Sequence, residues 1–179
     1  MAAGATIHTF SVSLADVDRG VYEELALRVA QHPSETEAFM LTRVLAYCLE
    51  YEEGIAFTEG VSATDEPAVV VRDLTGRLLA WIEVGAPDAA RLHTGSKAAE
   101  RTAVYTHRDP AKLLPQWAGK KIHRADAITL HSFDPGFVDD AVRALGRRNE
   151  LTVSLTEGQL YLDLNGTTFS TAVHEHPLE

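Results

Sequence analysis

One glutamate stands out in this sequence because it lies near the end of an apolar run. Residues 78–84, LLAWIEV, are apolar enough to form a buried strand, yet they include Glu83. Burying an isolated carboxylate costs several kcal/mol unless another group compensates its charge. The sequence therefore predicts that Glu83 has a partner, binds a metal ion or faces an open cleft.

A second acid is expected close to Glu83. Residues 73–76, DLTG, have the composition of a turn. A hairpin folded about Leu74 or Thr75 would bring Asp65 opposite Glu83 or its neighbour. In one of these two registers the carboxylates share a face of the sheet, and a slip of one residue separates them. Two adjacent carboxylates repel each other, and a hard dication such as Mg²⁺ or Mn²⁺ is their natural counterpart.

The same two acids also have a purely structural explanation. Glu83 could mark the point at which the strand reaches solvent, and Asp65 could cap a turn before Pro67. Pro67 has no amide proton to donate to a strand ladder, so regular pairing would begin only after it. From the spacing alone, both explanations stay open.

The elements that would position these acids follow from the apolar periodicity of the chain. Residues 5–14 alternate apolar and polar side chains and predict a strand, whereas residues 16–31 predict a helix. Ser34 as N-cap and Glu37 three positions later would form the capping box of a second helix. Further helices are expected over residues 88–100, 111–117 and 136–148, and further strands over residues 55–58, 102–107 and 128–131 and in a hairpin around residues 157–158.

This order of elements predicts the fold class. Strands and helices alternate in the middle of the chain and strands dominate its ends, which indicates an α/β fold with a central mixed β-sheet flanked by helices. Residues 1–179 contain no internal repeat or linker and are expected to form a single domain. The N-terminus has no secretory signal, no apolar run is long enough to span a membrane, and Cys48 is the single cysteine. We therefore expect a cytoplasmic protein without membrane contact.

The net charge of −10 argues against tight, sequence-independent coating of nucleic acid. A phosphate backbone would need a local basic patch that acts against the overall field of the protein. The densest group of basic residues is Lys112, Lys120, Lys121, His123 and Arg124. This group is either such a patch for nucleic acid or an ordinary solvated loop.

Four segments of the chain resemble the YaeQ family of uncharacterised bacterial proteins, namely HPSETEAFML, FTEGVSATDEP, WIEVGAPD and AVYTH. The resemblance extends over nearly the whole chain. It implies a variant of the PD-(D/E)XK nuclease-like (restriction-endonuclease-like) fold, in which an Asp on one strand and a (D/E)-x-K on the next hold Mg²⁺, often with a Glu from a preceding helix. It further implies that Asp65 and Glu83 are the strand acids and that Glu35 of HPSET is the helix acid. All three would ligate Mg²⁺ or Mn²⁺, although the helix dipole alone would also favour Glu35 in a first helical turn.

The sequence departs from that pattern at one position. Gly85 stands where the superfamily has its catalytic lysine. Lys97 on the following helix, with His93 one turn before it, could substitute for this lysine or could simply be solvated. The resemblance thus implies either a metal-dependent phosphodiesterase of nuclease type with Glu35, Asp65, Glu83 and Lys97 in its site, or a catalytically inactive nuclease-fold protein that acts as a binding or regulatory module.

Overall fold

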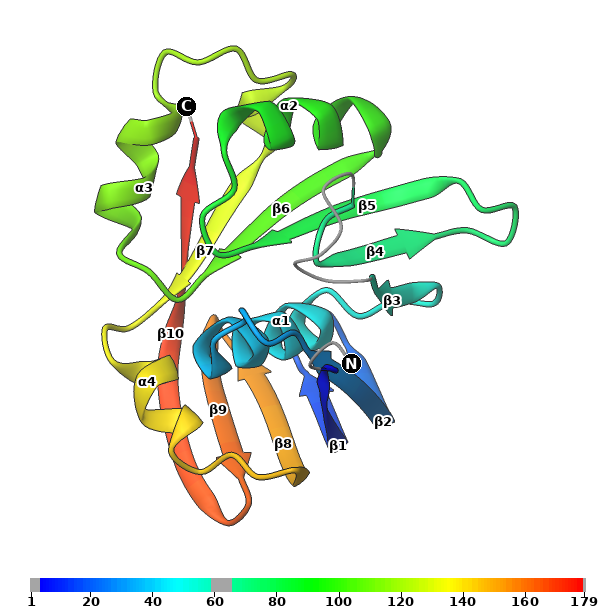
Figure 1. Cartoon of the computed structure of the whole chain (residues 1–179), viewed down its shortest axis with the longest axis vertical. Helices are drawn as coiled ribbons and strands as arrows, with labels where there is room; N and C mark the ends of the chain where they lie inside the picture. The colour runs from blue at the N-terminus through cyan, green and yellow to red at the C-terminus, as the bar shows by residue number, and fades with distance from the viewer. Residues whose placement is uncertain (1–3, 59–65, 179) are drawn as a thin grey trace. The chain divides into compact units, whose positions relative to one another are not determined.

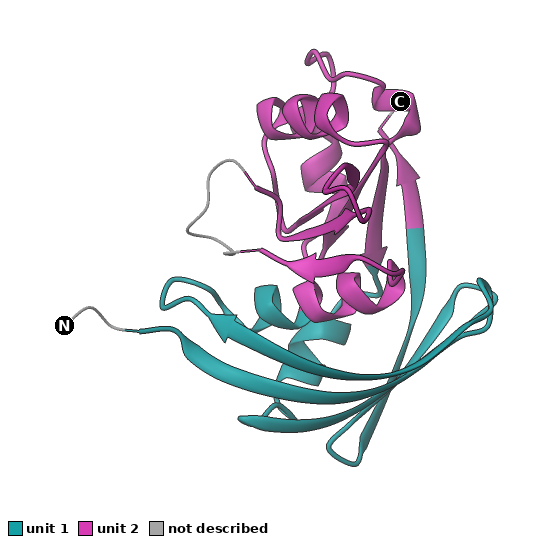
Figure 2. Ribbon diagram, turned by 90° about the vertical axis from the view of Figure 1, so that its right-hand side faces the viewer, with its two compact units in different colours: residues 1–41, 133–174 teal, residues 42–132, 175–179 magenta. Residues whose placement is uncertain are grey.

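The computed structural model describes residues 4–58 and 66–178 (Figure 1). The described chain forms two compact units, shown in different colours in Figure 2. Unit 1 comprises Met1–Leu41 and Phe133–His174, and unit 2 comprises Thr42–Ser132 and Glu175–Glu179. The expectation of one domain over residues 1–179 stays a prediction. Within the described ranges, every helix is too short or too polar to cross a membrane.

Unit 1 is built on a mixed sheet with the strand order β2-β1-β8-β9-β10. Only β1 and β8 run parallel, and the other neighbours are antiparallel. The short helix α4 (Phe137–Val142) buries Phe137, Val138 and Ala141. The strands are β1 (Thr6–Asp16), β2 (Val21–Gln31), β8 (Arg148–Thr156), β9 (Gln159–Leu164) and β10 (Thr167–Pro177), the last of which ends in unit 2.

The predicted helix over residues 16–31 is wrong, because most of this segment is the strand β2. It pairs with β1 along its whole length, from Asp16 opposite Val21 to Thr6 opposite Gln31. Leu27 and Val29 are buried while the residues between and beside them are exposed, which is the two-residue period of a strand. Helix-favouring Ala, Glu and Leu residues are overridden here by pairing and by burial of one face.

Unit 2 contains the strand order β7-β6-β5-β4-β3. The neighbours β3, β4 and β5 are antiparallel, whereas β5, β6 and β7 are parallel. The sheet is therefore mixed, and with the helices that flank it the predicted α/β class is confirmed. The strands are β3 (Ile55–Phe57), β4 (Val69–Arg72), β5 (Leu78–Val84), β6 (Arg101–Thr106) and β7 (Thr129–Phe133).

Two crossover helices cover one face of this sheet, α2 (Ala89–Ala98) and α3 (Pro110–Trp117), which were expected over residues 88–100 and 111–117. Their shared core consists of Leu92, Val104, Leu113, Trp117, Ile128 and Leu130. The indole nitrogen of Trp117 donates to the carbonyl of Pro87 at 2.8 Å. A short 3₁₀ turn, η2 (Ala125–Ala127), precedes β7.

The helix α1 (Glu37–Leu49) begins later than predicted and has a different cap. The Thr36 hydroxyl accepts a hydrogen bond from the amide of Phe39 at 3.0 Å, so Thr36 and not Ser34 caps the helix. The Ser34 hydroxyl instead contacts Nδ1 of His32 at 2.8 Å. The helix predicted over residues 136–148 is also too long, since α4 ends at Val142 and β8 begins at residue 148.

Candidate functional site

Glu83 lies near the end of β5, is 4% exposed and has the compensating partner that its burial requires. The Arg91 guanidinium donates from Nε to Glu83 Oε2 at 3.1 Å, and its Nη2 lies 3.4 Å from Oε1. The indole nitrogen of Trp81 donates to the same Oε2 at 2.8 Å. The charged partner of Glu83 within the described part of the chain is therefore an arginine.

Arg91 is fixed in the first turn of α2, where its amide donates to the N-cap Asp88 at 2.8 Å. Its Nη2 also donates to the backbone carbonyl of Glu66 at 2.6 Å. One guanidinium thus joins α2, the end of β5 and the segment that leads into β4. Asp65, the predicted first acid, precedes Glu66 directly but lies outside the described residues.

The environment of Glu83 acts on its acidity in opposing ways. Burial raises the pKa of its carboxyl above the ordinary value, whereas the charge of Arg91 and the hydrogen bonds from Trp81 and Arg91 lower it. The nearby Asp88 adds to the upward shift. Because the net shift is upward, the cost of desolvation exceeds the compensation, and ionised Glu83 depends on a cation beside it.

The predicted register of the β4–β5 hairpin is wrong. Val69 pairs with Ile82, not with residue 79 or 80, and a bulge interrupts the ladder between Val71 and Arg72. The turn spans residues 73–77 and is closed by a hydrogen bond from the Asp73 amide to the Arg77 carbonyl at 3.0 Å. The longer turn and the bulge shift the pairing, so that the same register continued would bring residue 68 opposite Glu83.

Gly85, at the position where the resemblance would place a lysine, has a backbone conformation that a lysine would not readily adopt. Its φ is +89°, in the left-handed region that residues with a Cβ rarely adopt. Its amide donates to the carbonyl of Tyr105 at 2.9 Å, which fixes the chain in this conformation. A lysine at this position would strain the chain at the end of β5.

Glu35 and Lys97 complete the predicted site. Glu35 lies in unit 1, just before α1, is 6% exposed and accepts a hydrogen bond at Oε1 from the His32 amide at 3.1 Å. Lys97 is exposed in the last turn of α2, and its direction about the helix axis differs by about 120° from that of Arg91, which faces Glu83. Their joint action with Asp65 and Glu83 stays a prediction.

No group of three or more His, Cys, Asp and Glu side chains could hold a metal ion within residues 4–58 and 66–178. Asp65 stands outside this search because it belongs to the segment that the structure leaves undescribed.

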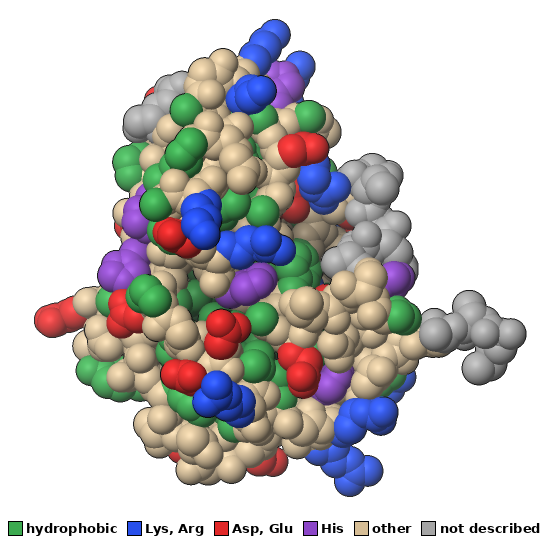
Figure 3. Space-filling view, turned by 60° about the vertical axis from the view of Figure 1, so that its left-hand side comes forward, with side chains coloured by type: hydrophobic (Ala, Val, Ile, Leu, Met, Phe, Trp, Pro, Cys, Tyr) green, Lys and Arg blue, Asp and Glu red, His purple; other side chains and the backbone are tan. Residues whose placement is uncertain are grey.

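Lys97 belongs to a cluster of basic side chains with His93, Lys121 and His123, which we call the basic patch. The amide of His123 donates to Nδ1 of His93 at 2.9 Å, and the two rings lie edge to face with centroids 6.4 Å apart. Desolvation lowers the pKa of His93, as do the charges of Lys97, Lys121 and His123. Figure 3 shows Lys, Arg and His side chains at the top of the molecule, the end that carries α2 in Figure 1.

Arg124, predicted as part of a basic patch, has a structural role. Its Nη2 donates to the carbonyls of Ser96 and Ala99 at 2.9 and 3.0 Å, at the C-terminal end of α2. These carbonyls carry the negative end of the helix dipole, so the guanidinium stabilises the helix terminus. Lys112 and Lys120 are exposed, which fits both a solvated surface and a patch for nucleic acid.

Sequence reasoning missed two features of unit 2. The first is Arg91, although a signal existed: it is the first basic residue after Glu83. The second is a polar cluster in which the Tyr105 hydroxyl donates to Glu50 Oε2 at 2.5 Å and the Tyr105 ring stacks on His131 at 4.3 Å. Arg101 pairs with the same Glu50 carboxylate. Arg101 and Tyr105 lie on β6, whereas Glu50 follows α1 and His131 lies on β7, and the sequence shows no spacing that joins all of them.

Comparisons with known proteins agree on one family. A model of the YaeQ protein family matches residues 1–173. The chain is 31% identical over 163 residues to the uncharacterized protein YaeQ of Salmonella typhi, with 90% of each chain covered. It is 37% identical over 111 residues to YaeQ of Escherichia coli (strain K12), covering 62% of this chain and 61% of that protein.

Solved structures give the same result. The crystal structure of YaeQ from Xanthomonas axonopodis pv. citri matches with a TM-score of 0.86 and 25% identity, covering 96% of this chain and 98% of the other. YaeQ from Pseudomonas syringae matches with a TM-score of 0.84 and 32% identity, covering 96% and 95%. The chain therefore belongs to the YaeQ family.

Proposed function

We propose that this chain has a PD-(D/E)XK nuclease-like fold and acts as a non-catalytic binding module for nucleic acid. The observation that carries the proposal is the pairing of Glu83 with Arg91 at 3.1 Å, because Glu83 is the acid that a nuclease of this type would use to hold its metal ion. The order of elements in unit 2 supports the fold assignment. An antiparallel β4–β5 pair carries an acid near the end of β5, and α2 leads from it to the parallel strand β6.

Electrostatics supports a site without metal. A dication about 4 Å from the Arg91 guanidinium would be repelled by about 8 kcal/mol at an effective dielectric constant of about 20. Glu83 has one carboxylate to balance both cations, and its Oε2 already accepts two hydrogen bonds. A metal ion would therefore have to displace Arg91. The left-handed backbone at Gly85, which a lysine would adopt only with strain, further disfavours a catalytic lysine beside this carboxylate.

The basic patch is the surface that would contact nucleic acid. Lys97 and Lys121 supply fixed positive charges, and the rings of His93 and His123 lie beside them. Such contacts neutralise phosphates and give binding that weakens as salt increases. The acidic remainder of the protein limits this contact to a small area, which suits a module with modest affinity rather than a coating protein.

Fluorescence anisotropy with labelled single- and double-stranded DNA and RNA, without metal, tests this proposal. We expect binding whose salt dependence decreases by about one unit of log–log slope for each of Lys97→Gln and Lys121→Gln. Arg143→Gln is the matched control, because Arg143 is an exposed cation on the distant α4 segment of the sequence. Absence of binding at low salt, or equal loss in the control, would contradict the proposal.

A second candidate is a metal-dependent phosphodiesterase, and one observation favours it. Arg91 binds both the Glu83 carboxylate and the carbonyl of Glu66, so one cation is bound by Glu83 and by the residue next to Asp65. Mg²⁺ or Mn²⁺ would take the place of the guanidinium, with Asp65 and Glu83 as ligands, Glu35 assisting and Lys97 steadying the transition-state charge.

Calorimetric titration with Mn²⁺, together with cleavage assays on DNA, RNA and a model phosphodiester, separates the two candidates. Metal binding and hydrolysis that both disappear in Asp65→Asn and Glu83→Gln would establish the phosphodiesterase. Nucleic-acid binding without cleavage, and without Mn²⁺ uptake at millimolar concentration, would establish the binding module.

A further inference from the structure

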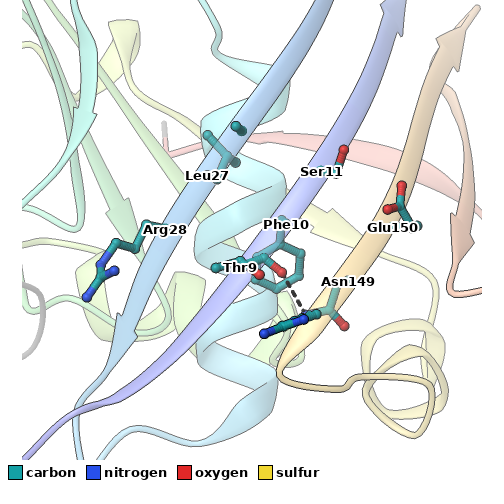
Figure 4. Close-up of a pocket in the computed structure, with 9 residues that line it drawn as sticks. Thr9, Phe10, Ser11, Leu27, Arg28, Asn149 and Glu150 are labelled. Atoms are coloured by element: carbon teal, nitrogen blue, oxygen red, sulfur yellow. Dashed lines mark hydrogen bonds between the residues drawn. The ribbon is translucent and has the colours of Figure 1, made fainter.

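The outward face of the unit 1 sheet is hollowed where β2, β1 and β8 lie side by side. A groove of about 500 Å³ is lined by residues of these three strands, including Thr9, Ser11, Ala26, Arg28, Arg148 and Glu150 (Figure 4). This volume lies within the range of sites that bind small molecules. Because three paired strands form its floor, the groove has a rigid base.

The strand register explains why this face is hollow. On β1, Thr9 and Ser11 point outward, while Phe10 between them points into the core. Thr9 lies between Arg28 of β2 and Arg148 of β8. Short hydroxyl side chains on the middle strand are thus flanked by long side chains on its neighbours, which produces a trough along β1.

The next row of the same face has different chemistry. Ser11 lies between Ala26 of β2 and Glu150 of β8. Residues two apart on a strand share a face and are separated by about 7 Å, so the Glu150 carboxylate follows the Arg148 guanidinium along the groove. The groove therefore offers cations in one row and a carboxylate in the next.

These charged groups are not used to hold the protein together. Neither the guanidiniums of Arg28 and Arg148 nor the carboxylate of Glu150 has a side-chain hydrogen bond or ion pair within the ranges that the structure describes. Other arginines of this acidic chain do pair with acids, namely Arg19, Arg77, Arg91, Arg101 and Arg143. Two arginines on either side of one threonine, with no acid opposite either of them, leave a positive charge that an anion would neutralise.

We propose that this groove binds a small molecule that carries an oxyanion, either a phosphate or a carboxylate, at the Thr9 row and hydrogen-bond donors at the Glu150 row. Arg28 and Arg148 start from backbones about 10 Å apart, which is close enough for both guanidiniums to contact one oxyanion above Thr9. Figure 4 shows Arg28 extended away from β1, so its guanidinium turns inward about its side-chain bonds when the anion binds. The Thr9 hydroxyl donates to the anion from below, and Glu150 accepts from hydroxyl or amino groups of the same molecule.

The first experiment uses the full chain and titrates inorganic phosphate and, separately, acetate at constant ionic strength. Chemical shifts of the Thr9, Ser11 and Arg148 amides are followed by NMR. We expect saturable shifts with one or both anions, and the stronger of the two identifies the oxyanion. Arg148→Gln and Arg28→Gln should each weaken binding by about tenfold or more, which is the loss of one charged hydrogen bond. Arg143→Gln, an exposed cation of the same unit, should leave the affinity unchanged.

A second experiment tests the Glu150 row. Ribose 5-phosphate should bind more tightly than inorganic phosphate if the phosphate arm succeeds, and lactate more tightly than acetate if the carboxylate arm succeeds. Glu150→Gln should remove that gain without weakening the simple anion. Absence of saturable shifts with either anion would overturn the proposal, as would unchanged affinity in Arg148→Gln. Equal affinity for the simple and hydroxylated ligands would overturn the role of Glu150. None of these outcomes depends on the basic patch of unit 2.

Discussion

Removing the positive charge beside Glu83 should destabilise the protein strongly. In Arg91→Ala the Glu83 carboxylate keeps its hydrogen bond from Trp81 but loses the guanidinium that balances its charge. Breaking a buried ion pair by removing one partner costs about 3–5 kcal/mol, because the other charge stays buried. The Glu83 side chain is 5% exposed but that of Arg91 is 29% exposed, so water can partly replace the guanidinium. We therefore expect a loss at the lower end, about 3 kcal/mol.

Thermal unfolding followed by circular dichroism measures this effect. For a chain of this length, about 3 kcal/mol corresponds to a decrease of about 6–12 °C in the unfolding midpoint. The exposed pair between Arg77 and Glu100 provides the matched control within unit 2. Arg77→Ala should cost less than about 1 kcal/mol, because exposed ion pairs contribute little.

Two further results distinguish the loss of charge balance from the loss of packing. Adding Glu83→Gln to Arg91→Ala should recover part of the stability, since the double variant has no uncompensated charge. The Arg91→Ala variant should also gain stability as the pH falls. Burial already raises the pKa of Glu83, and removing Arg91 raises it further. The penalty for the ionised acid is full above that pKa and disappears as the acid protonates below it. A loss below about 1 kcal/mol, with no recovery in the double variant, would refute the reasoning.

Three other predictions concern the core of unit 2. Burial lowers the pKa of His131, so the contribution of this residue to stability is full above the ordinary value of 6.5 and is lost as the pH falls through the lowered value. His131→Phe should therefore flatten the fall in unfolding temperature between about pH 7 and pH 5, and an unchanged slope would contradict this. Burial raises the pKa of Cys48 to about 12, so a thiol reagent at neutral pH should label this residue only after the protein is unfolded in urea. Rapid labelling of the native protein would count against the burial of Cys48. A Cβ at Gly95 would lie 2.5 Å from the Trp81 ring, so Gly95→Ala should lower the free energy of unfolding in urea by about 1–3 kcal/mol. Gly146→Ala, whose Cβ would have its nearest contact at 3.5 Å, should lower it clearly less, and equal losses would exclude the clash.

The sequence predicts helix positions well where a cap and a periodic apolar face coincide. A helix was expected over residues 88–100, and Asp88 is its N-cap, since its carboxylate accepts the amide of Arg91. Prediction of helices from the sequence fails where the chain favours a helix locally but pairs as a strand, as in β2. Val21, Leu25 and Val29 recur every four residues, as on one face of a helix, whereas Leu25, Leu27 and Val29 alternate as in a strand. Only the partner strand β1 decides between the two periods.

In the candidate site, too, features that depend on neighbouring residues in the sequence could be predicted, and features that depend on distant contacts could not. The need to compensate Glu83 was visible from its apolar neighbours, and of the three possibilities stated for it the described residues show a partner, Arg91. The register of the β4–β5 hairpin could not be predicted from the sequence, because it depends on a bulge at Val71 and on a turn closed by side-chain contacts of Asp73. A bulge is a response to tertiary packing and leaves little trace in a single sequence.

The choice between a guanidinium and a metal ion beside Glu83 has a consequence that stability measurements can detect. A guanidinium is attached to the chain, so the wild-type stability should be independent of Mn²⁺. In Arg91→Ala the same carboxylate and the Glu66 carbonyl lose their shared cation, and both are oxygen ligands of the kind that hard dications bind. If Asp65 also reaches this point, Mn²⁺ should restore about 2.7 kcal/mol at a concentration of one hundred times its dissociation constant. Restoration that disappears in Asp65→Asn would mean that Arg91 occupies a metal position. If the stability of Arg91→Ala does not change with Mn²⁺, the guanidinium is a structural partner of Glu83 and does not occupy a metal site.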